Sequence, residues 1–252
     1  MRCPRVAIFD LDDTLAESFH AIPSDTLEGL RGLLRRIPVA VITGATFSRM
    51  EEQFLPFFET HPRIDQFYIF PVCSAQAYGY GEKGWHRIYD LALAEEDRLR
   101  IEKTISDIVS TMDMLRGIPH DGQQLVNKGS QVAYTHVGVE ATRETKDSWD
   151  PDGSKRTALW NAIRDALPEF EVLMGGKTTI DITRKEINKA YGVQWLSTHL
   201  GIPASEMLYV GDALYPGGND AVVIPTGIET RSVSSPEETK EILKELLAAC
   251  SA

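Results

Sequence analysis

Two aspartates, two positions apart in the sequence, directly follow a short apolar run near the N-terminus. The run is Val6–Phe9, and Asp10 and Asp12 follow it. Alternate residues of an extended chain point the same way, so we expect the two carboxylates side by side. Proteins tolerate such repulsion where a cation lies between the carboxylates or where one keeps a proton for acid/base work, and magnesium with a phosphate group would satisfy both conditions. The alternative is an acidic turn in which Asp13 or Thr14 only caps the next helix.

Two later apolar runs also end in polar residues. Val39–Ile42 leads into Thr43 and Gly44, and Met207–Val210 leads through a glycine into Asp212. A threonine hydroxyl and exposed backbone N–H groups beside a helix N-terminus can bind a phosphate, although the same pattern also forms ordinary turns. Open α/β sheets bind ligands beyond the carboxyl ends of their strands. The sequence therefore predicts that these groups and the two aspartates lie at one site.

The order of Asp10, Asp12 and Thr14 after an apolar run resembles the signature of the haloacid dehalogenase superfamily, whose phosphotransferases form an aspartyl-phosphate. The resemblance implies that Asp10 is the nucleophile, that Asp12 is the general acid/base, and that Thr43 with Gly44 binds the phosphate. The chemistry agrees, since a carboxylate attacks an anionic phosphoryl group only when a cation screens its approach. Asp12 could protonate the leaving oxygen and then deprotonate the attacking water.

The remaining charged groups suit the same reaction. Oxygen ligands favour magnesium, and we expect them to be Asp10, the backbone carbonyl of Asp12, and Asp212. Lys189 opens a predicted helix, where the helix dipole does not stabilise a lysine, so a specific use is favoured over a solvated position. We expect it to neutralise the nucleophile and the phosphoryl oxygens. Asn219 and Asp220 are expected just outside the metal ligands, with Asp220 orienting Lys189 or a metal-bound water.

A closer resemblance, over nearly the whole chain, is to the eukaryotic-type phosphomannomutase branch of this superfamily. It is carried by Gly211–Asp220, by Thr230–Glu238 and by the spacing of the chain. That branch inserts an α+β cap between its second and third motifs, and it places a hydroxyl residue and an aspartate of a cap strand against the sugar. Gly175–Asp181 matches this strand, so Thr179 and Asp181 are candidate sugar contacts, with ordinary edge-strand residues as the alternative.

The chain departs from the mutase pattern in its arginines. In the mutases that the chain resembles, a cluster of arginines holds the phosphate group that is not undergoing reaction. Residues Leu15–His20 contain no arginine, Gln123–Gln131 lacks a Glu-x-Arg pair, and His136 stands near another expected arginine. Arg116 is retained as a candidate for substrate binding.

Without those arginines a phosphatase is easier to support than a mutase. We therefore expect a magnesium-dependent phosphohydrolase that acts on a small phosphorylated metabolite, with sugar phosphates as the favoured class. A phosphomannomutase-type mutase is the alternative. A catalytically silent sugar-phosphate sensor is a weaker one, because a sensor needs no acid/base group two residues from a nucleophile.

Composition bounds the class of protein. The 252 residues, 42% hydrophobic and 25% charged, are typical of a globular protein, and a formal charge of −11 argues against nucleic acid as a partner. No stretch approaches the ~20 apolar residues of a membrane span, and Met1–Arg5 leaves no room for a signal peptide, so we expect a cytoplasmic protein with no membrane partner. Cys3, Cys73 and Cys250 are scattered, which favours a reducing compartment and no disulfide. A homodimer is compatible with these features.

The elements that must position the site alternate between strands and helices. Apolar runs at 6–9, 39–42, 67–71, 207–210 and 222–224 are the predicted core strands. Between them, long helices at 94–114 and 154–167 mix with alternating strands at 131–135, 171–174 and 178–182, as in an α+β layer. The prediction is an α/β fold with a doubly wound parallel-sheet core, HAD-like and Rossmannoid, and an inserted α+β cap. Its domains are core 1–81, cap 82–186 and core 187–252.

Overall fold

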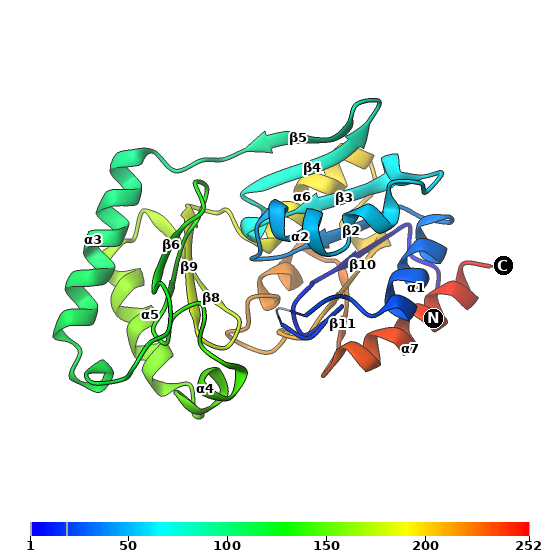
Figure 1. Cartoon of the computed structure of the whole chain (residues 1–252). Helices are drawn as coiled ribbons and strands as arrows, with labels where there is room; N and C mark the ends of the chain where they lie inside the picture. The colour runs from blue at the N-terminus through cyan, green and yellow to red at the C-terminus, as the bar shows by residue number, and fades with distance from the viewer. Residues whose placement is uncertain (1, 19, 252) are drawn as a thin grey trace. The chain divides into compact units, whose positions relative to one another are not determined.

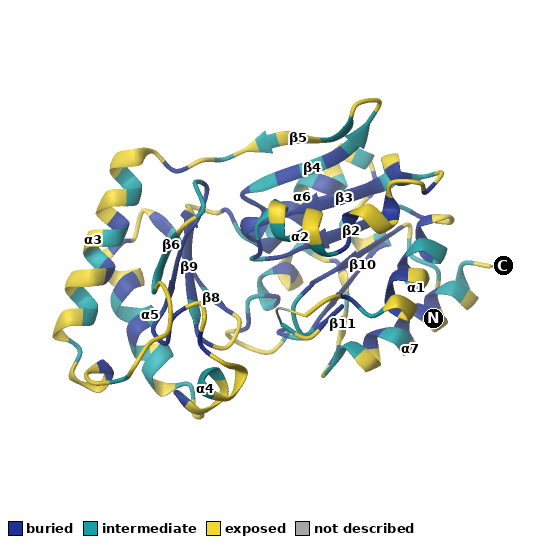
Figure 2. Ribbon diagram, in the orientation of Figure 1, coloured by how far each residue is buried: buried dark blue, intermediate teal, exposed yellow. Residues whose placement is uncertain are grey.

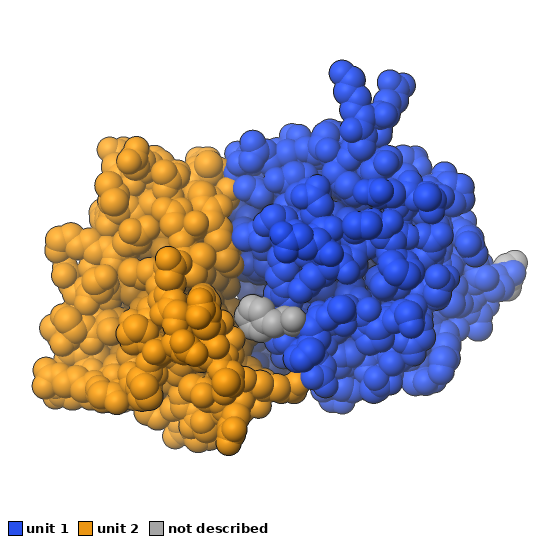
Figure 3. All heavy atoms as spheres, in the orientation of Figure 1, with its two compact units in different colours: residues 1–90, 189–252 blue, residues 91–188 orange. Residues whose placement is uncertain are grey.

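The computed structural model describes residues 2–18 and 20–251, which fall into two compact units (Figure 3). The core unit comprises the chain up to Asp90 and from Lys189 onward, and the cap unit comprises Leu91–Asn188. We expected the cap to begin at residue 82 and to end at 186. Residues 84–90 instead form a strand of the core sheet, which moves the first boundary nine residues along the chain.

The core unit is built on a seven-stranded sheet in the order β11-β10-β1-β2-β3-β4-β5 (Figure 1). The strands from β11 to β3 are parallel, and β4 and β5 continue the sheet antiparallel. This confirms the predicted α/β class with a largely parallel sheet. The strands are β1 (Val6–Phe9), β2 (Val39–Ile42), β3 (Phe67–Phe70), β4 (Gln76–Gly81), β5 (Gly84–Asp90), β10 (Met207–Gly211) and β11 (Glu229–Ser232).

Helices cover both faces of the core sheet because its central strands are apolar on both sides. Ala7 and Phe9 of β1 pack with α1 (Ser24–Leu34), α2 (Phe47–Gln53) and α7 (Pro236–Ala249) on one face. Val6 and Ile8 pack with α6 (Lys189–Leu200) and the short 3₁₀ segment Ala221–Thr226 on the other. Figure 2 shows these strands as buried between the helices. The sheet edge that carries the predicted motifs is therefore held from both sides.

Two parts of the predicted core are wrong. Residues 222–224, predicted as a strand, belong to the 3₁₀ segment, which contains Pro225. The edge strand is β11 instead, a mostly exposed segment with no apolar run to reveal it. The predicted domain boundary after residue 81 falls inside the hairpin of β4 and β5, where Gly84, at the end of the turn between them, has a φ of +93°. Glycine tolerates that backbone conformation without the strain that another residue would have.

The cap unit is an α+β layer, as predicted. Its antiparallel sheet has the order β6-β7-β9-β8, and Ile180 and Ile182 of β9 pack against Ile101 of α3 and Ile163 of α5. The opposite face of β9 carries Asp181. The elements of this unit are α3 (Glu95–Thr111), β6 (Leu125–Asn127), β7 (Val132–Thr135), α4 (Arg143–Ser148), α5 (Ser154–Ala166), β8 (Phe170–Gly175) and β9 (Thr179–Arg184).

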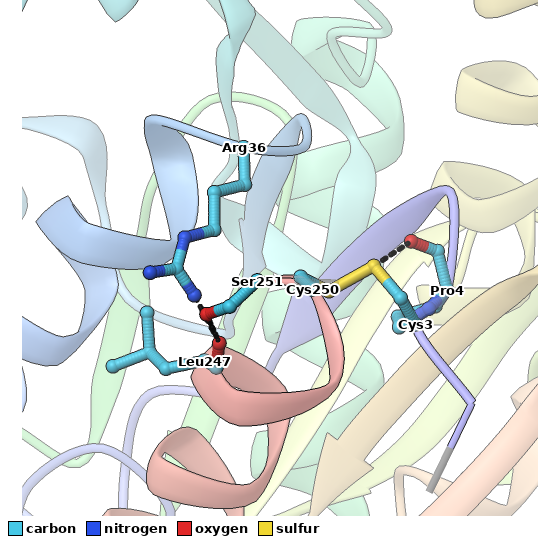
Figure 4. The surroundings of a disulfide bond; sticks show 6 residues. All are labelled: Cys3, Pro4, Arg36, Leu247, Cys250 and Ser251. Atoms are coloured by element: carbon cyan, nitrogen blue, oxygen red, sulfur yellow. Dashed lines mark hydrogen bonds between the residues drawn. A yellow bond between two sulfur atoms is a disulfide. The ribbon is translucent and has the colours of Figure 1, made fainter.

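A disulfide joins Cys3 to Cys250 (Figure 4). The expectation that the cysteines form no disulfide is wrong for this pair, whereas Cys73 is buried and forms no disulfide. The two residues are 247 apart in sequence, so no local spacing could show the pairing. Their Cα atoms lie 4.9 Å apart, within the usual range for a disulfide, because the segment before β1 and the end of α7 meet in space.

In the described residues, no helix is both long enough and apolar enough to cross a membrane.

Candidate active site

Lys189 lies between two buried aspartates at the carboxyl end of the core sheet. Its Nζ is 2.7 Å from Asp10 Oδ1 and 2.7 Å from Asp220 Oδ1, and the lysine side chain is 1% exposed. Burial alone would lower the pKa of Lys189, but Asp10 and Asp220 hold it well above its usual value. The lysine therefore places a fixed positive charge beside the carboxylate of Asp10, the predicted nucleophile.

Asp10, Asp212 and Asp220 form a cluster in which one carboxylate oxygen of each lies within 4.8 Å of the others. β1 and β10 are neighbouring parallel strands, so Asp10 and Asp212, which follow them, meet at the same edge of the sheet. Burial raises the pKa of Asp10, with Lys189 opposing it, and burial followed by Asp220 raises the pKa of Asp212. Hard carboxylate oxygens so arranged could hold a divalent metal ion, whose charge would favour the ionised carboxylates.

Asp220 is surrounded by donors. Its Oδ1 accepts from Lys189 Nζ and from the Tyr209 hydroxyl, and its Oδ2 accepts from the backbone N–H of Ala213 at 3.0 Å. Gly211 is required beside it, because a Cβ at that position would lie 2.4 Å from Asp220 Oδ2. Both oxygens are thus engaged, which suits a residue that orients Lys189 better than one that binds a metal directly.

Asn219 and Thr14 each adjoin one aspartate of the cluster, Asn219 in the sequence and Thr14 through a hydrogen bond. Asn219 is half-buried in the loop before Asp220. The Thr14 hydroxyl donates to Asp212 Oδ1 at 3.3 Å, so the threonine of the first motif contacts the aspartate of the third rather than only capping a helix. Tyr209 was not found from the sequence, because it stands inside the apolar run of β10 and reads as a core residue.

Asp12 has a different partner from Asp10. Its two carboxylate oxygens accept from the two terminal nitrogens of Arg49, at 2.7 and 3.1 Å. Because β1 ends at Phe9, the alternation of a strand does not govern where Asp12 points. Sequence reasoning missed Arg49, whose only sequence signal is its place in the first turn of the helix after the second motif.

Thr43 follows β2, the other parallel neighbour of β1. It is 1% exposed, and its hydroxyl oxygen accepts from the backbone N–H of Ala45 at 3.0 Å, which leaves the hydroxyl hydrogen able to donate. Thr43 and Gly44 thus begin a tight loop that leads into α2, at the same sheet edge as Asp10.

A left-handed turn supports this loop. Val72, Cys73 and Ser74 have φ values of 45°, 55° and 68°, which cost roughly 1–2 kcal/mol per residue for non-glycine residues. The N–H of Cys73 donates to the carbonyl of Thr43, and the N–H of Val72 to that of Ala45, each at 2.9 Å. Strained backbone of this kind is concentrated at functional sites. No residue type in the turn reveals it from the sequence.

The cap candidates lie in the other unit. Asp181 is 3% exposed and lies opposite Ala133 of β7, while Thr179 lies at the start of β9 and is half-buried. Arg116 is on the surface, with its side chain 70% exposed and paired with Asp113 at 3.1 Å.

His136, which stands near an expected arginine, is buried in the cap. Its Nδ1 lies 2.7 Å from the Tyr134 hydroxyl and its Nε2 lies 3.1 Å from the carbonyl of Leu115. A carbonyl only accepts, so Nε2 carries the hydrogen and Nδ1 accepts from Tyr134. Burial lowers the pKa of His136, and the ring is a neutral structural group rather than a substitute for an arginine.

Comparisons with known proteins agree with the motifs. A family model described as eukaryotic phosphomannomutase matches residues 25–249. The phosphomannomutase of Schizosaccharomyces pombe is 23% identical over 250 residues, covering 96% of this chain and 93% of that protein. Phosphomannomutase 2 of Dictyostelium discoideum is 24% identical, covering 95% of each.

Solved structures show the same fold at lower identity. The IMP-nucleotidase of Plasmodium falciparum superimposes with a TM-score of 0.73 at 16% identity, covering 97% of this chain and 68% of that one. The C-terminal domain of C. albicans trehalose-6-phosphate phosphatase gives 0.67 at 15% identity, covering 98% and 93%. These structures show the fold, and the family model, which matches most of the chain, shows that the chain belongs to the eukaryotic phosphomannomutase family of the haloacid dehalogenase superfamily.

Proposed function

We propose that the protein is a magnesium-dependent phosphohydrolase that acts on a small phosphorylated metabolite of the sugar-phosphate class. The observation that carries the proposal is the buried cluster in which Lys189 contacts Asp10 and Asp220 at 2.7 Å, with Asp212 beside them. A nucleophilic carboxylate needs positive charge close by to approach a phosphate anion. Lys189 supplies one such charge, and the carboxylates of the cluster could hold a magnesium ion that supplies a second.

Asp10, Asp212 and the backbone carbonyl of Asp12 would hold magnesium. The ion, when bound, supplies the charge that screens a phosphoryl group from the attacking carboxylate. Asp10 attacks phosphorus, and Lys189 stabilises the charge that is redistributed in the transfer. Asp12 gives a proton to the leaving oxygen, and it then takes one from the water that hydrolyses the aspartyl-phosphate.

The charges of the cap favour water, rather than a second hydroxyl of the sugar phosphate, as the acceptor of the phosphoryl group. A mutase must hold a second phosphate group, which calls for charge-assisted partners. Arg116 is engaged by Asp113, and Lys177 and Arg143 both face Asp147, at 2.5 and 3.8 Å. A phosphate would have to displace these carboxylates.

The mutase is the second candidate, because the family model and the curated relatives are those of phosphomannomutases. One experiment separates the two. The protein is incubated with mannose 1-phosphate, magnesium and a catalytic amount of mannose 1,6-bisphosphate, and inorganic phosphate and mannose 6-phosphate are both quantified. We expect free phosphate with little 6-phosphate. Near-stoichiometric conversion to the 6-phosphate, with negligible free phosphate, would establish the mutase instead.

Asp10→Asn is the control for this experiment, because the amide keeps the shape of the side chain and loses its nucleophilicity. It should abolish either activity while leaving the protein folded. A folded Asp10→Asn variant that still releases phosphate would refute the aspartyl-phosphate route.

A further inference from the structure

Arg49 of α2 binds the carboxylate of Asp12 at two points. Nη2 donates to Oδ1 at 2.7 Å and Nη1 donates to Oδ2 at 3.1 Å. The two side chains are 19% and 28% exposed. A planar two-point contact restrains the plane of the carboxyl group as well as its position, which a single ammonium group could not do.

The guanidinium of Arg49 is itself held by a second side chain of α2. Its Nε donates to Gln53 Oε1 at 3.2 Å, one helical turn further along α2. The backbone N–H of Arg49 donates to the hydroxyl of Thr46, which caps the helix just after the Thr43 loop. Met50, the next residue, is fully buried in the core. The arginine therefore presents its fork from a fixed helix, and Asp12 is the group that it positions.

A surface ion pair is the simpler interpretation, and exposed pairs contribute little to stability. The pair of Arg231 and Glu245 is an example, with side chains 44% and 53% exposed and a single contact at 3.0 Å. The contact of Arg49 with Asp12 is more buried, has two hydrogen bonds and is braced by Gln53. It also involves the residue two positions after the proposed nucleophile.

We propose that Arg49 is a positioning residue that fixes the Asp12 carboxyl group for proton transfer to the leaving oxygen. The inference rests on the proposed function. When Asp12 carries a proton, one oxygen still accepts from Arg49 while the other directs the proton outward. Asp10 forms a bond to phosphorus, the bond from phosphorus to the leaving oxygen breaks with its electron pair, and that oxygen takes the proton of Asp12.

The second half of the reaction returns the proton. Water attacks phosphorus and gives one proton to Asp12, while the bond from phosphorus to Asp10 breaks with its electron pair. Phosphate leaves, and both carboxyl groups regain their starting states. Arg49 contacts neither phosphorus nor the leaving oxygen in this sequence, so its effect must depend on how much the leaving group needs a proton.

That dependence is the test. Release of the leaving alcohol or phenol is measured for mannose 6-phosphate, whose alkoxide needs a proton, and for p-nitrophenyl phosphate, whose phenolate does not. Arg49→Met should lower kcat/KM for mannose 6-phosphate by about 10–100-fold and for p-nitrophenyl phosphate by less than about threefold. Arg49→Lys should recover little, since it keeps the charge and loses the fork. Gln53→Ala, which removes only the brace, should shift the ratio of the two rates in the same direction by less.

Two controls accompany the variants. Arg231→Met removes a comparable arginine from an exposed ion pair and should change neither rate. In an Asp12→Asn background, Arg49→Met should have no further selective effect, because the group that it positions is already gone.

An equal loss for both esters would overturn the inference, since Arg49 would then act on phosphate binding or on folding. A gain for mannose 6-phosphate would also overturn it, because Arg49 would then hold Asp12 in an unproductive position. Wild-type protein that releases neither leaving group would refute the proposed function itself, before any variant is compared. A mutase would convert mannose 6-phosphate to mannose 1-phosphate without releasing mannose, so release of mannose by the wild type must be shown before the variants are compared.

Discussion

Adding magnesium to the metal-free protein should raise the temperature at which the core unit unfolds, and Asp212→Asn should remove most of that rise. Oxygens of Asp10, Asp212 and Asp220 lie within 4.8 Å of one another, a separation at which two like charges repel by about 3.5 kcal/mol at an effective dielectric constant near 20. Lys189 offsets one of the three negative charges. A divalent cation would offset the other two.

The size of the rise follows from ligand linkage. A ligand at about 100 times its dissociation constant, bound only by the folded state, stabilises that state by about 2.7 kcal/mol. A domain of this size gains roughly 2–4 °C for each kcal/mol, so the melting temperature should increase by about 5–11 °C. Differential scanning calorimetry of protein stripped with EDTA, with magnesium added at constant ionic strength, measures the effect.

Asp212→Asn should act with opposite signs in the two states. It should stabilise the metal-free protein, because one like charge is removed, and it should weaken the magnesium response by about a hundredfold in concentration. Asp65→Asn removes an exposed acid of the core unit and should leave the response unchanged. The reasoning would be refuted by a melting temperature that ignores magnesium, or by an equal rise in Asp212→Asn and wild type.

Three further perturbations test other parts of the molecule. Lys189→Met leaves two buried carboxylates without their cation, so it should abolish phosphate release and lower the free energy of unfolding by about 3–5 kcal/mol in urea titrations; a variant of wild-type stability would contradict the buried triad. The pKa of His136 is lower in the folded state than its unfolded value of 6.5, so the stability of the cap that is present above pH 6.5 should be lost as the pH falls toward the folded value, and thermal scans should show a weaker fall in His136→Gln. Cys3→Ser opens the disulfide to Cys250 and should lower the free energy of unfolding by about 2–4 kcal/mol. A reductant should lower the free energy of unfolding of the wild type but not that of the variant. An unfolding midpoint that neither the substitution nor the reductant changes would contradict the pairing.

The parts of the fold that could be predicted are those where one local pattern decides the structure. Val6–Phe9, Val39–Ile42 and Met207–Val210 are apolar on both faces, so their strands and the polar residues at their ends were visible in the sequence. The edge strand Glu229–Ser232 is polar and exposed, and its place in the sheet depends on pairing with β10 rather than on its own residues.

The candidate site divides in the same way. Asp10 and Lys189 could be proposed because each stands at the end or start of an element that was predictable, and Asp220 could be proposed from the resemblance of Gly211–Asp220 to the phosphomannomutase branch. Arg49 could not, since its contact depends on how α2 packs against Asp12, 37 residues earlier in the chain. Tyr209 could not, since the apolar run of a buried strand does not show that its hydroxyl meets Asp220. The roles of the site residues stay predictions until the substitutions above are measured.

The bond between Cys3 and Cys250 closes residues 3–250 into a covalent ring. A ring that is cut once is still a single molecule. Protease cleavage at any one position between the two cysteines, the segment that joins β5 to α3 included, would leave both pieces attached through the sulfur bridge. On a denaturing gel such a nicked protein should run as one band, and it should separate into two fragments only after reduction. The link also holds the segment before β1 to the end of α7, so these two parts of the core unit cannot separate from each other until the bond is broken.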